Sequence, residues 1–236
     1  MESEFGQFCP VALASECLTP KWTLLIIREL CAGSTRFSDI HRGVPRISAT
    51  LLKQRLSDLE FAGIVARAPA EHGVAQRYVL TDAGQELRAV LSKIGEWGQR
   101  WARDIRPEDL DPGWLVWNIH RRLNTRSMPD GRTTIEIYFT DAPKNHRKFW
   151  LVHDKGNVEV CLKPPGFDVD VEMATKVRVL AEIWRGIRNI DDEIRIGSVQ
   201  LHGDANLCRA LPGWLLLSVY APIKRARFQL SAGAST

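Results

Sequence analysis

The sequence predicts an α+β protein in two parts, and three observations support this prediction. Residues 34–81 contain, in order, a short helix, a tight turn, a capped second helix and two short strands joined by a polar loop. A long amphipathic helix follows, and beyond it runs of alternating apolar residues predict strands between helices. The order within 34–81 is that of a winged helix-turn-helix, and the later segments predict an α+β domain with a mostly antiparallel sheet.

Two helices are expected before this motif. Pro10 suits the first position of a helix that runs to about Leu18, with Cys9 as its N-cap residue. A second helix from about Pro20 to Ala32 would end at Gly33. Its expected core residues are Trp22, Leu25, Ile26 and Leu30. A short helix around 37–42 and the helix after Ser48 complete a body of helices.

The helix after Ser48 has two distinct faces. Ser48 is a good N-cap residue, and Leu52, Leu56 and Leu59 follow at the spacing of one buried face. A helix turns by about 100° per residue, so the opposite face can be assigned. It carries polar side chains that can hydrogen-bond to base edges, namely Thr50, Gln54 and Ser57 with Lys53 beside them.

Positive charge is concentrated around this helix. Residues 41–57 hold four cations and no acidic residue, as many positive charges as the net +4 of the whole chain. These cations are Arg42, Arg46, Lys53 and Arg55. Such a local cluster attracts DNA phosphates, although cations on an amphipathic helix can also simply face solvent.

The expected wing follows directly. Ile64 to Pro69 and Gln76 to Thr81 are predicted strands, and the Glu71-His72-Gly73 tip between them supplies a glycine for the turn. Arg67 and Arg77 would flank the wing and meet phosphates or the minor groove.

A long helix from about Ala83 to Ile105 is the expected dimer contact. Its apolar residues recur at steps of three and four, namely Leu87, Val90, Ile94, Trp97 and Trp101. The helix could instead cover the core of a monomer. The apolar seam, however, is longer than the small helical body would cover, and two exposed tryptophans are unfavourable in water.

The segment 106–113 is charged, contains two prolines and a glycine, and is the expected linker between domains 1–105 and 114–236. Expected helices lie at 114–123, 174–184 and about 206–216, and expected strands at 134–140, 148–153, 158–163 and 167–172. Apolar side chains of this half could line a ligand pocket or fill a core. They are Trp117, Phe149, Leu151, Val160, Ile183 and Trp184.

Composition excludes several classes of protein. The start MESEFGQ is acidic and polar, and no apolar run approaches the roughly 20 residues that a membrane span needs, so we expect a cytoplasmic protein without a membrane partner. The five cysteines form no CxxC pair and the histidines show no ligand spacing, so neither a metal nor a cofactor is expected. An enzyme is disfavoured because no nucleophile elbow or phosphate-binding loop occurs.

From Cys9 to Ala102 the chain resembles the HxlR-type branch of the MarR-like transcriptional regulators. The resemblance lies in CPVALASECL, KWTLLIIREL, RFSDI, ISATLLKQRLSDLEFAGIV, YVLTDAGQEL and EWGQRW, in the family's order. It implies a homodimer that places one recognition helix in each of two successive major grooves of a double-stranded operator. It further implies that Thr50, Lys53, Gln54 and Ser57 meet bases, while Arg36, Ser48, Arg55, Arg67 and Arg77 meet the DNA backbone.

The sequence differs from the family pattern at two places and matches its N-terminal cysteine. Thr19-Pro20 stands where the family often has glycines, and Glu71 lies at a wing tip where cations are favourable. Cys9 matches an N-terminal cysteine that senses oxidants or electrophiles in some family members. A thiol at a helix N-terminus should have a lowered pKa, although Cys9 could instead be a small residue that locks the first helix against the dimer partner.

The second half more faintly resembles a sterol-carrier-protein-like domain, through its strand-rich meander and VQLHGDANLCRAL at 199–211. Such domains often enclose an apolar cavity. The sequence therefore predicts a dimeric DNA-binding regulator that responds to a small apolar ligand or to thiol oxidation. The alternative is a ligand-binding module whose helix-turn-helix makes protein contacts.

Overall fold

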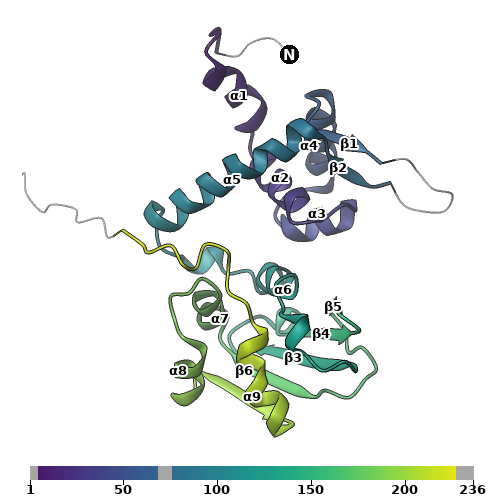
Figure 1. Ribbon diagram of the computed structural model, residues 1–236, viewed down its shortest axis with the longest axis vertical. Helices are drawn as coiled ribbons and strands as arrows, with labels where there is room; N and C mark the ends of the chain where they lie inside the picture. The colour runs from purple at the N-terminus through teal and green to yellow at the C-terminus, as the bar shows by residue number, and fades with distance from the viewer. Residues whose placement is uncertain (1–4, 69–75, 227–236) are drawn as a thin grey trace, which may run out of the picture. The chain divides into compact units, whose positions relative to one another are not determined.

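The computed structural model describes residues 5–68 and 76–226, which form two compact units that divide between Gly95 and Glu96. The chain has the α+β architecture expected from the sequence (Figure 1). In the described residues, no helix is both long enough and apolar enough to cross a membrane. The predicted wing tip, Glu71 to Gly73, lies outside the described residues.

The N-terminal unit is a winged helix-turn-helix. Its elements are α1 (Pro10–Leu18), α2 (Thr23–Cys31), α3 (Phe37–Gly43), α4 (Ala49–Phe61), β1 (Val65–Arg67), β2 (Tyr78–Leu80) and the first part of α5 (Asp82–Trp101). α2 begins three residues later than predicted, because Trp22 takes a left-handed conformation with φ of 81° that closes a turn before the helix. Ile26, Ile40, Leu52 and Leu56 lie at the centre of its core.

The C-terminal unit contains a five-stranded sheet. Its helices are α6 (Pro112–His120), α7 (Val177–Trp184), α8 (Ile190–Arg195) and α9 (Ala205–Trp214). Its strands are β3 (Thr133–Phe139), β4 (Lys148–Asp154), β5 (Asn157–Cys161), β6 (Val171–Thr175) and β7 (Val199–Gly203), and the strand order is β5-β4-β3-β6-β7. Only β3 and β6 pair in parallel, so the sheet is mostly antiparallel as predicted.

The register places one face of the sheet in the core. Ile135 and Ile137 of β3 lie opposite Val171 and Met173 of β6, and their side chains therefore share a face. These residues form one cluster with apolar side chains of α6, α7 and α9. Helices thus cover this face of the sheet.

Further boundaries differ from the predictions. The predicted strand 167–172 is observed at Val171–Thr175, while α8 and β7 were not predicted. α5 ends at Trp101 and not near Ile105, because the Arg225 guanidinium donates to the carbonyl oxygens of Gln99 and Ala102, which would accept hydrogen bonds from the next helical turn. The last turn of α5 therefore belongs to the C-terminal unit, whereas the predicted linker 106–113 contains a 3₁₀ turn and the first residues of α6.

Candidate nucleic-acid interface

α4 presents the two faces that its sequence predicts. Leu52, Leu56 and Leu59 are buried in the N-terminal core. The Ser48 hydroxyl accepts a hydrogen bond from the Leu51 amide at 3.2 Å and so caps the helix. The exposed residues of the opposite face are Thr50, Lys53, Gln54 and Ser57. Because the leucines pack α4 against the core of the N-terminal unit, the polar face of α4 is directed toward solvent.

Asp58 closes the C-terminal end of this polar face. Its Oδ1 atom accepts a hydrogen bond from the Gln54 amide at 2.8 Å, and its Oδ2 atom pairs with Arg55 at 2.8 Å. Arg55 also donates to the Lys21 carbonyl oxygen. Arg55 therefore already has partners within the N-terminal unit, and these partners compete with the contact to the DNA backbone that the resemblance implied. The Gln54 hydrogen bond to Asp58 uses one of the two hydrogens on its side-chain nitrogen.

Two exposed arginines lie together beside the wing. Arg36, just before α3, forms an antiparallel bridge with Arg77, just before β2, and the neighbouring Tyr78 amide donates to the Thr35 carbonyl oxygen at 2.8 Å. Side chains of directly opposed residues project to the same side. The pair therefore forms a local positive site between α3 and the wing.

Arg67 differs from this pair. Its guanidinium pairs with Glu60 at 2.8 Å, and that hydrogen bond, followed by the charge of Glu60, raises the pKa of Arg67 above its usual range. The neighbouring carboxylate offsets the attraction of Arg67 for phosphate. Arg67 is thus a weaker candidate for backbone contact than Arg36 or Arg77.

The turn before α4 is held by a residue that the sequence analysis missed. Glu29 is only 1% exposed and pairs with Arg28 at 2.8 Å. Arg28 also donates to the Gly43 carbonyl oxygen at 2.8 Å, and a Cβ at Gly43 would lie within 1.9 Å of the Glu29 carboxylate. Glu29 and Gly43 thereby connect α2 to the end of α3. The signal in the sequence was an acidic residue within the apolar run of α2.

The apolar seam of α5 is largely uncovered in the single chain. Leu87 packs against the N-terminal core, but Val90, Ile94, Trp97 and Trp101 are exposed, with Trp97 at 63%. α1 has no buried residue and projects away from the α2–α4 body (Figure 1). α1 exposes Val11 and Leu13, and Phe8, just before the helix, is 97% exposed. The sequence analysis recognised the seam on α5 and missed the apolar surface of α1.

Cys9 occupies the N-cap position of α1 and is exposed. The backbone amides of Ala12 and Val11, at the start of α1, lower the pKa of its thiol. By contrast, burial raises the pKa of Cys31, Cys161 and Cys208. Cys9 is thus the cysteine with the most thiolate character among these four.

Most of the residues expected to line a ligand pocket lie in or against the apolar core of the C-terminal unit. Phe149, Leu151 and Ile183 are at most 2% exposed in the core, and Val160 and Trp184 pack against them. Trp117 instead lies under the Arg121 guanidinium, 5.0 Å from the ring centre. Five of the six residues thus belong to or pack against one apolar cluster.

Known proteins match the N-terminal part of this chain. The model of the HxlR-like helix-turn-helix family matches residues 17–106. The uncharacterized HTH-type transcriptional regulator YvaP of Bacillus subtilis is 37% identical over 108 residues, which are 45% of this chain and 97% of that protein. An uncharacterized HTH-type transcriptional regulator of Methanothermobacter thermautotrophicus is 32% identical over 94 residues, 39% of this chain and 72% of that protein.

One solved structure is the reduced form of the transcriptional regulator YodB from B. subtilis. It is 35% identical and covers 39% of this chain and 93% of its own, with a TM-score of 0.35. Because nearly all of YvaP aligns with this chain at 37% identity, and the family model matches the same region, the assignment is direct. This chain belongs to the HxlR-like helix-turn-helix family.

Proposed function

We propose that this protein is a homodimeric, sequence-specific DNA-binding regulator of transcription that acts on an inverted-repeat operator in the cytoplasm, and that it is not an enzyme. The observation that carries the proposal is the polar face of α4. Thr50, Lys53, Gln54 and Ser57 are exposed on a helix that its leucines hold rigidly in a winged helix-turn-helix. Side chains of this kind form hydrogen bonds with base edges in the major groove.

The cations around α4 supply the expected backbone contacts. Arg36 and Arg77 lie side by side, and Ser48 stands at the N-terminus of α4, where a phosphate is favoured. We assign Arg55 and Arg67 a secondary part, because each already pairs with a carboxylate.

A dimer accounts for the exposed apolar surface of α1 and α5. Val90, Ile94, Trp97 and Trp101 would meet their counterparts in a second copy, and Phe8, just before α1, would be covered by the same contact. Two recognition helices could then occupy major grooves about 34 Å apart. Since the chain carries a net charge of only +4, affinity would depend on both copies binding together.

The recognition helix is tested with the double variant Lys53→Ala/Gln54→Ala. Footprinting on the DNA that flanks the protein's own gene should show a protected inverted repeat for the unchanged protein and none for the variant. The matched control is Lys144→Ala/Asn145→Ala, which removes an exposed lysine and amide from the C-terminal unit. Sequence-selective binding by a folded, dimeric Lys53→Ala/Gln54→Ala protein would disprove the proposal.

Thiol oxidation is the first proposed signal. Cys9 is exposed and its pKa is lowered, so its thiolate is available to oxidants. Oxidant treatment should change operator affinity in the unchanged protein and leave a Cys9→Ser variant unaffected. An equal response of both proteins would assign the sensitivity to another residue.

The C-terminal unit is proposed to be a sterol-carrier-like domain that senses a small ligand or supports assembly. Its five-stranded sheet with helices packed on one face is consistent with this role. A small ligand would change operator affinity if it and the operator favoured different arrangements of the dimer. The factor by which the ligand changes operator affinity must equal the factor by which the operator changes ligand affinity.

A further inference from the structure

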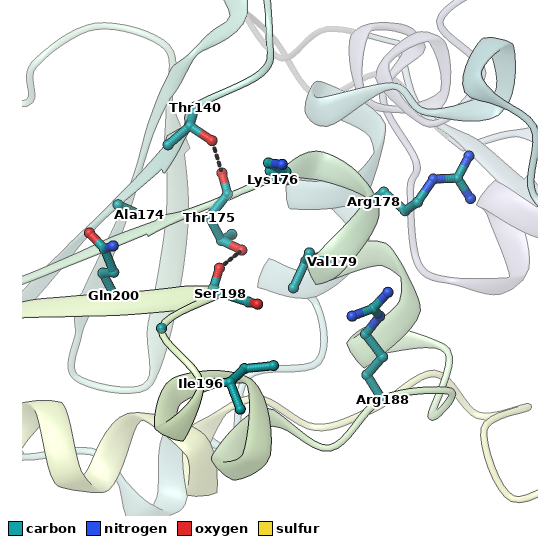
Figure 2. A pocket seen from close by; sticks show the side chains of 11 residues that line it. Thr140, Ala174, Thr175, Lys176, Arg178, Val179, Arg188, Ile196, Ser198 and Gln200 are labelled. Carbon is teal, nitrogen blue, oxygen red and sulfur yellow. Dashed lines mark hydrogen bonds between the residues drawn. The ribbon is translucent and has the colours of Figure 1, made fainter.

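A cleft of about 600 Å³ opens in the C-terminal unit. It lies where the ends of β6 and β7 meet the start of α7 and the turn after α8 (Figure 2). Its volume falls in the range of about 300–1,000 Å³ that is usual for small-molecule sites. The lining residues are Thr140, Ala174, Thr175, Lys176, Arg178, Val179, Arg188, Ile196, Gly197, Ser198 and Gln200.

Hydrogen bonds fix the strand ends that form the cleft. The Thr175 hydroxyl donates to the Ser198 carbonyl oxygen at 2.9 Å, and the Thr140 hydroxyl donates to the Thr175 carbonyl oxygen at 3.4 Å. Within the described part of the chain, the Ser198 hydroxyl and the Gln200 amide have no hydrogen-bond partner. Two polar groups on a fixed framework therefore remain available to a ligand.

The cleft also carries surplus positive charge. Three of its eleven lining residues are cations and none is a carboxylate. Arg178 and Arg188 both pair with Glu182, at 3.4 and 2.5 Å, and Arg188 also pairs with Glu193 at 3.2 Å. The two positive charges of Arg178 and Arg188 are therefore offset by the two negative charges of Glu182 and Glu193.

Lys176 is the third cation of the cleft and provides its surplus positive charge. Among the residues that the structure describes, no carboxylate pairs with it. The guanidinium of Arg178 points away from Ser198 and Gln200 (Figure 2). The α7 N-terminus adds little, because the Val177 amide already donates to Asp141 at 3.0 Å. One uncompensated positive charge suits a ligand with a single negative charge.

One wall of the cleft is apolar. Val179 is buried beneath it, Ala174 lies on β6, and Ile196 is 62% exposed. Covering an isoleucine of this exposure with an apolar group removes hydrocarbon surface from water, which favours binding. The ligand should therefore combine an anionic head with an apolar body.

We propose that this cleft binds a small organic acid with one carboxylate and an apolar body. The carboxylate would meet the Lys176 ammonium, the Ser198 hydroxyl and the Gln200 amide, and the apolar body would cover Val179 and Ile196. This inference rests on the proposed ligand-sensing role of the C-terminal unit and names the class of ligand. The binding step can be measured without DNA, so its failure is distinct from failure of the regulator proposal.

α7 offers a route from this cleft to the dimer helix. Lys176 precedes the first residue of α7 and Arg185 follows its last, about 14 Å further along the helix axis. Arg185 donates to the Gln99 side chain in the last turn of α5. A shift of α7 on ligand binding would thus act on α5.

The test uses the full-length protein and isothermal titration with sodium octanoate, with octanol as the neutral probe. Octanoate should bind at least tenfold more tightly than octanol. Lys176→Met should weaken octanoate binding about tenfold, which corresponds to one charge-assisted hydrogen bond. Lys144→Met, at another exposed lysine, should leave it unchanged.

The apolar wall is tested separately. Ile196→Ser should weaken octanoate binding and leave the weaker binding of acetate unchanged, because acetate is too short to reach the wall. No octanoate binding, equal affinity for octanol, or unchanged affinity in Lys176→Met would overturn the proposal. Operator footprinting on the same protein samples tests the regulator proposal independently.

Discussion

The Arg185 guanidinium donates two hydrogen bonds to the Gln99 Oε1 atom, at 3.2 and 2.7 Å. Gln99 is only 8% exposed although it lies in the last turn of α5, and Arg185 caps the end of α7. Burial lowers the pKa of Arg185, which nonetheless stays charged at neutral pH. The two hydrogen bonds from a half-buried charge to a neutral acceptor thus hold the last turn of α5 in the C-terminal unit.

Replacing Gln99 should destabilise the C-terminal unit. Gln99→Ala removes the acceptor and leaves the Arg185 guanidinium partly desolvated, so we expect a loss of about 1–3 kcal/mol in its free energy of unfolding. Urea denaturation followed by circular dichroism measures this change. Gln85→Ala is the matched control, because Gln85 is an exposed residue of α5 that pairs with Arg88, and its loss should cost under about 0.5 kcal/mol.

Neutralising Arg36 or Arg77 should weaken DNA binding without changing sequence preference. Removing one phosphate contact should reduce the slope of log K against log salt concentration by about 0.9. Fluorescence anisotropy with operator and random DNA at several salt concentrations gives this slope. Arg67→Ala should change the slope less, because Glu60 already pairs with Arg67. Equal changes for all three variants would show that the Glu60 pair does not matter for binding.

A charge at Trp97 should break the dimer. Trp97→Asp places a carboxylate within the exposed apolar seam of α5, and we expect the dimer Kd to rise at least thirtyfold, equivalent to about 2 kcal/mol. Sedimentation equilibrium measures this constant. Leu162→Asp is the control, since Leu162 is 65% exposed but lies in the C-terminal unit, outside α1 and α5. An unchanged dimer in Trp97→Asp would place the interface elsewhere.

Alkylation of both Cys9 and Cys31 should become faster as the pH rises, but Cys9 should reach its full rate at a lower pH than Cys31. The lowered pKa of Cys9 means that its thiolate persists at lower pH, whereas the raised pKa of Cys31 delays its thiolate to higher pH. Iodoacetamide should therefore label Cys9 first at pH 7, and Cys31 should gain reactivity only as the pH increases further. Mass spectrometry of peptides gives both rates, and similar rates at pH 7 would argue that Cys9 has no enhanced reactivity.

Local sequence determined most of the N-terminal unit. The Ser48 cap and the spacing of Leu52, Leu56 and Leu59 fixed both the position of α4 and the direction of its polar face, because capping and helical periodicity act over a few residues. Similarly, the apolar seam identified α5 and Pro10 marked the start of α1. The α+β character of the second half also followed from alternating residues.

The tertiary structure decided what depends on distant contacts. Gln99 and Arg185 are 86 positions apart, and Glu29 meets Gly43 only after α2 and α3 have packed, so no local pattern reveals either contact. Likewise, most residues of the expected ligand pocket gathered in or against one buried cluster, while Lys176, Ile196 and Ser198 came together around a separate cleft. Helix faces are set by neighbours in the chain, whereas buried pairs and cavities are set by how whole elements pack, and only the fold determines that packing.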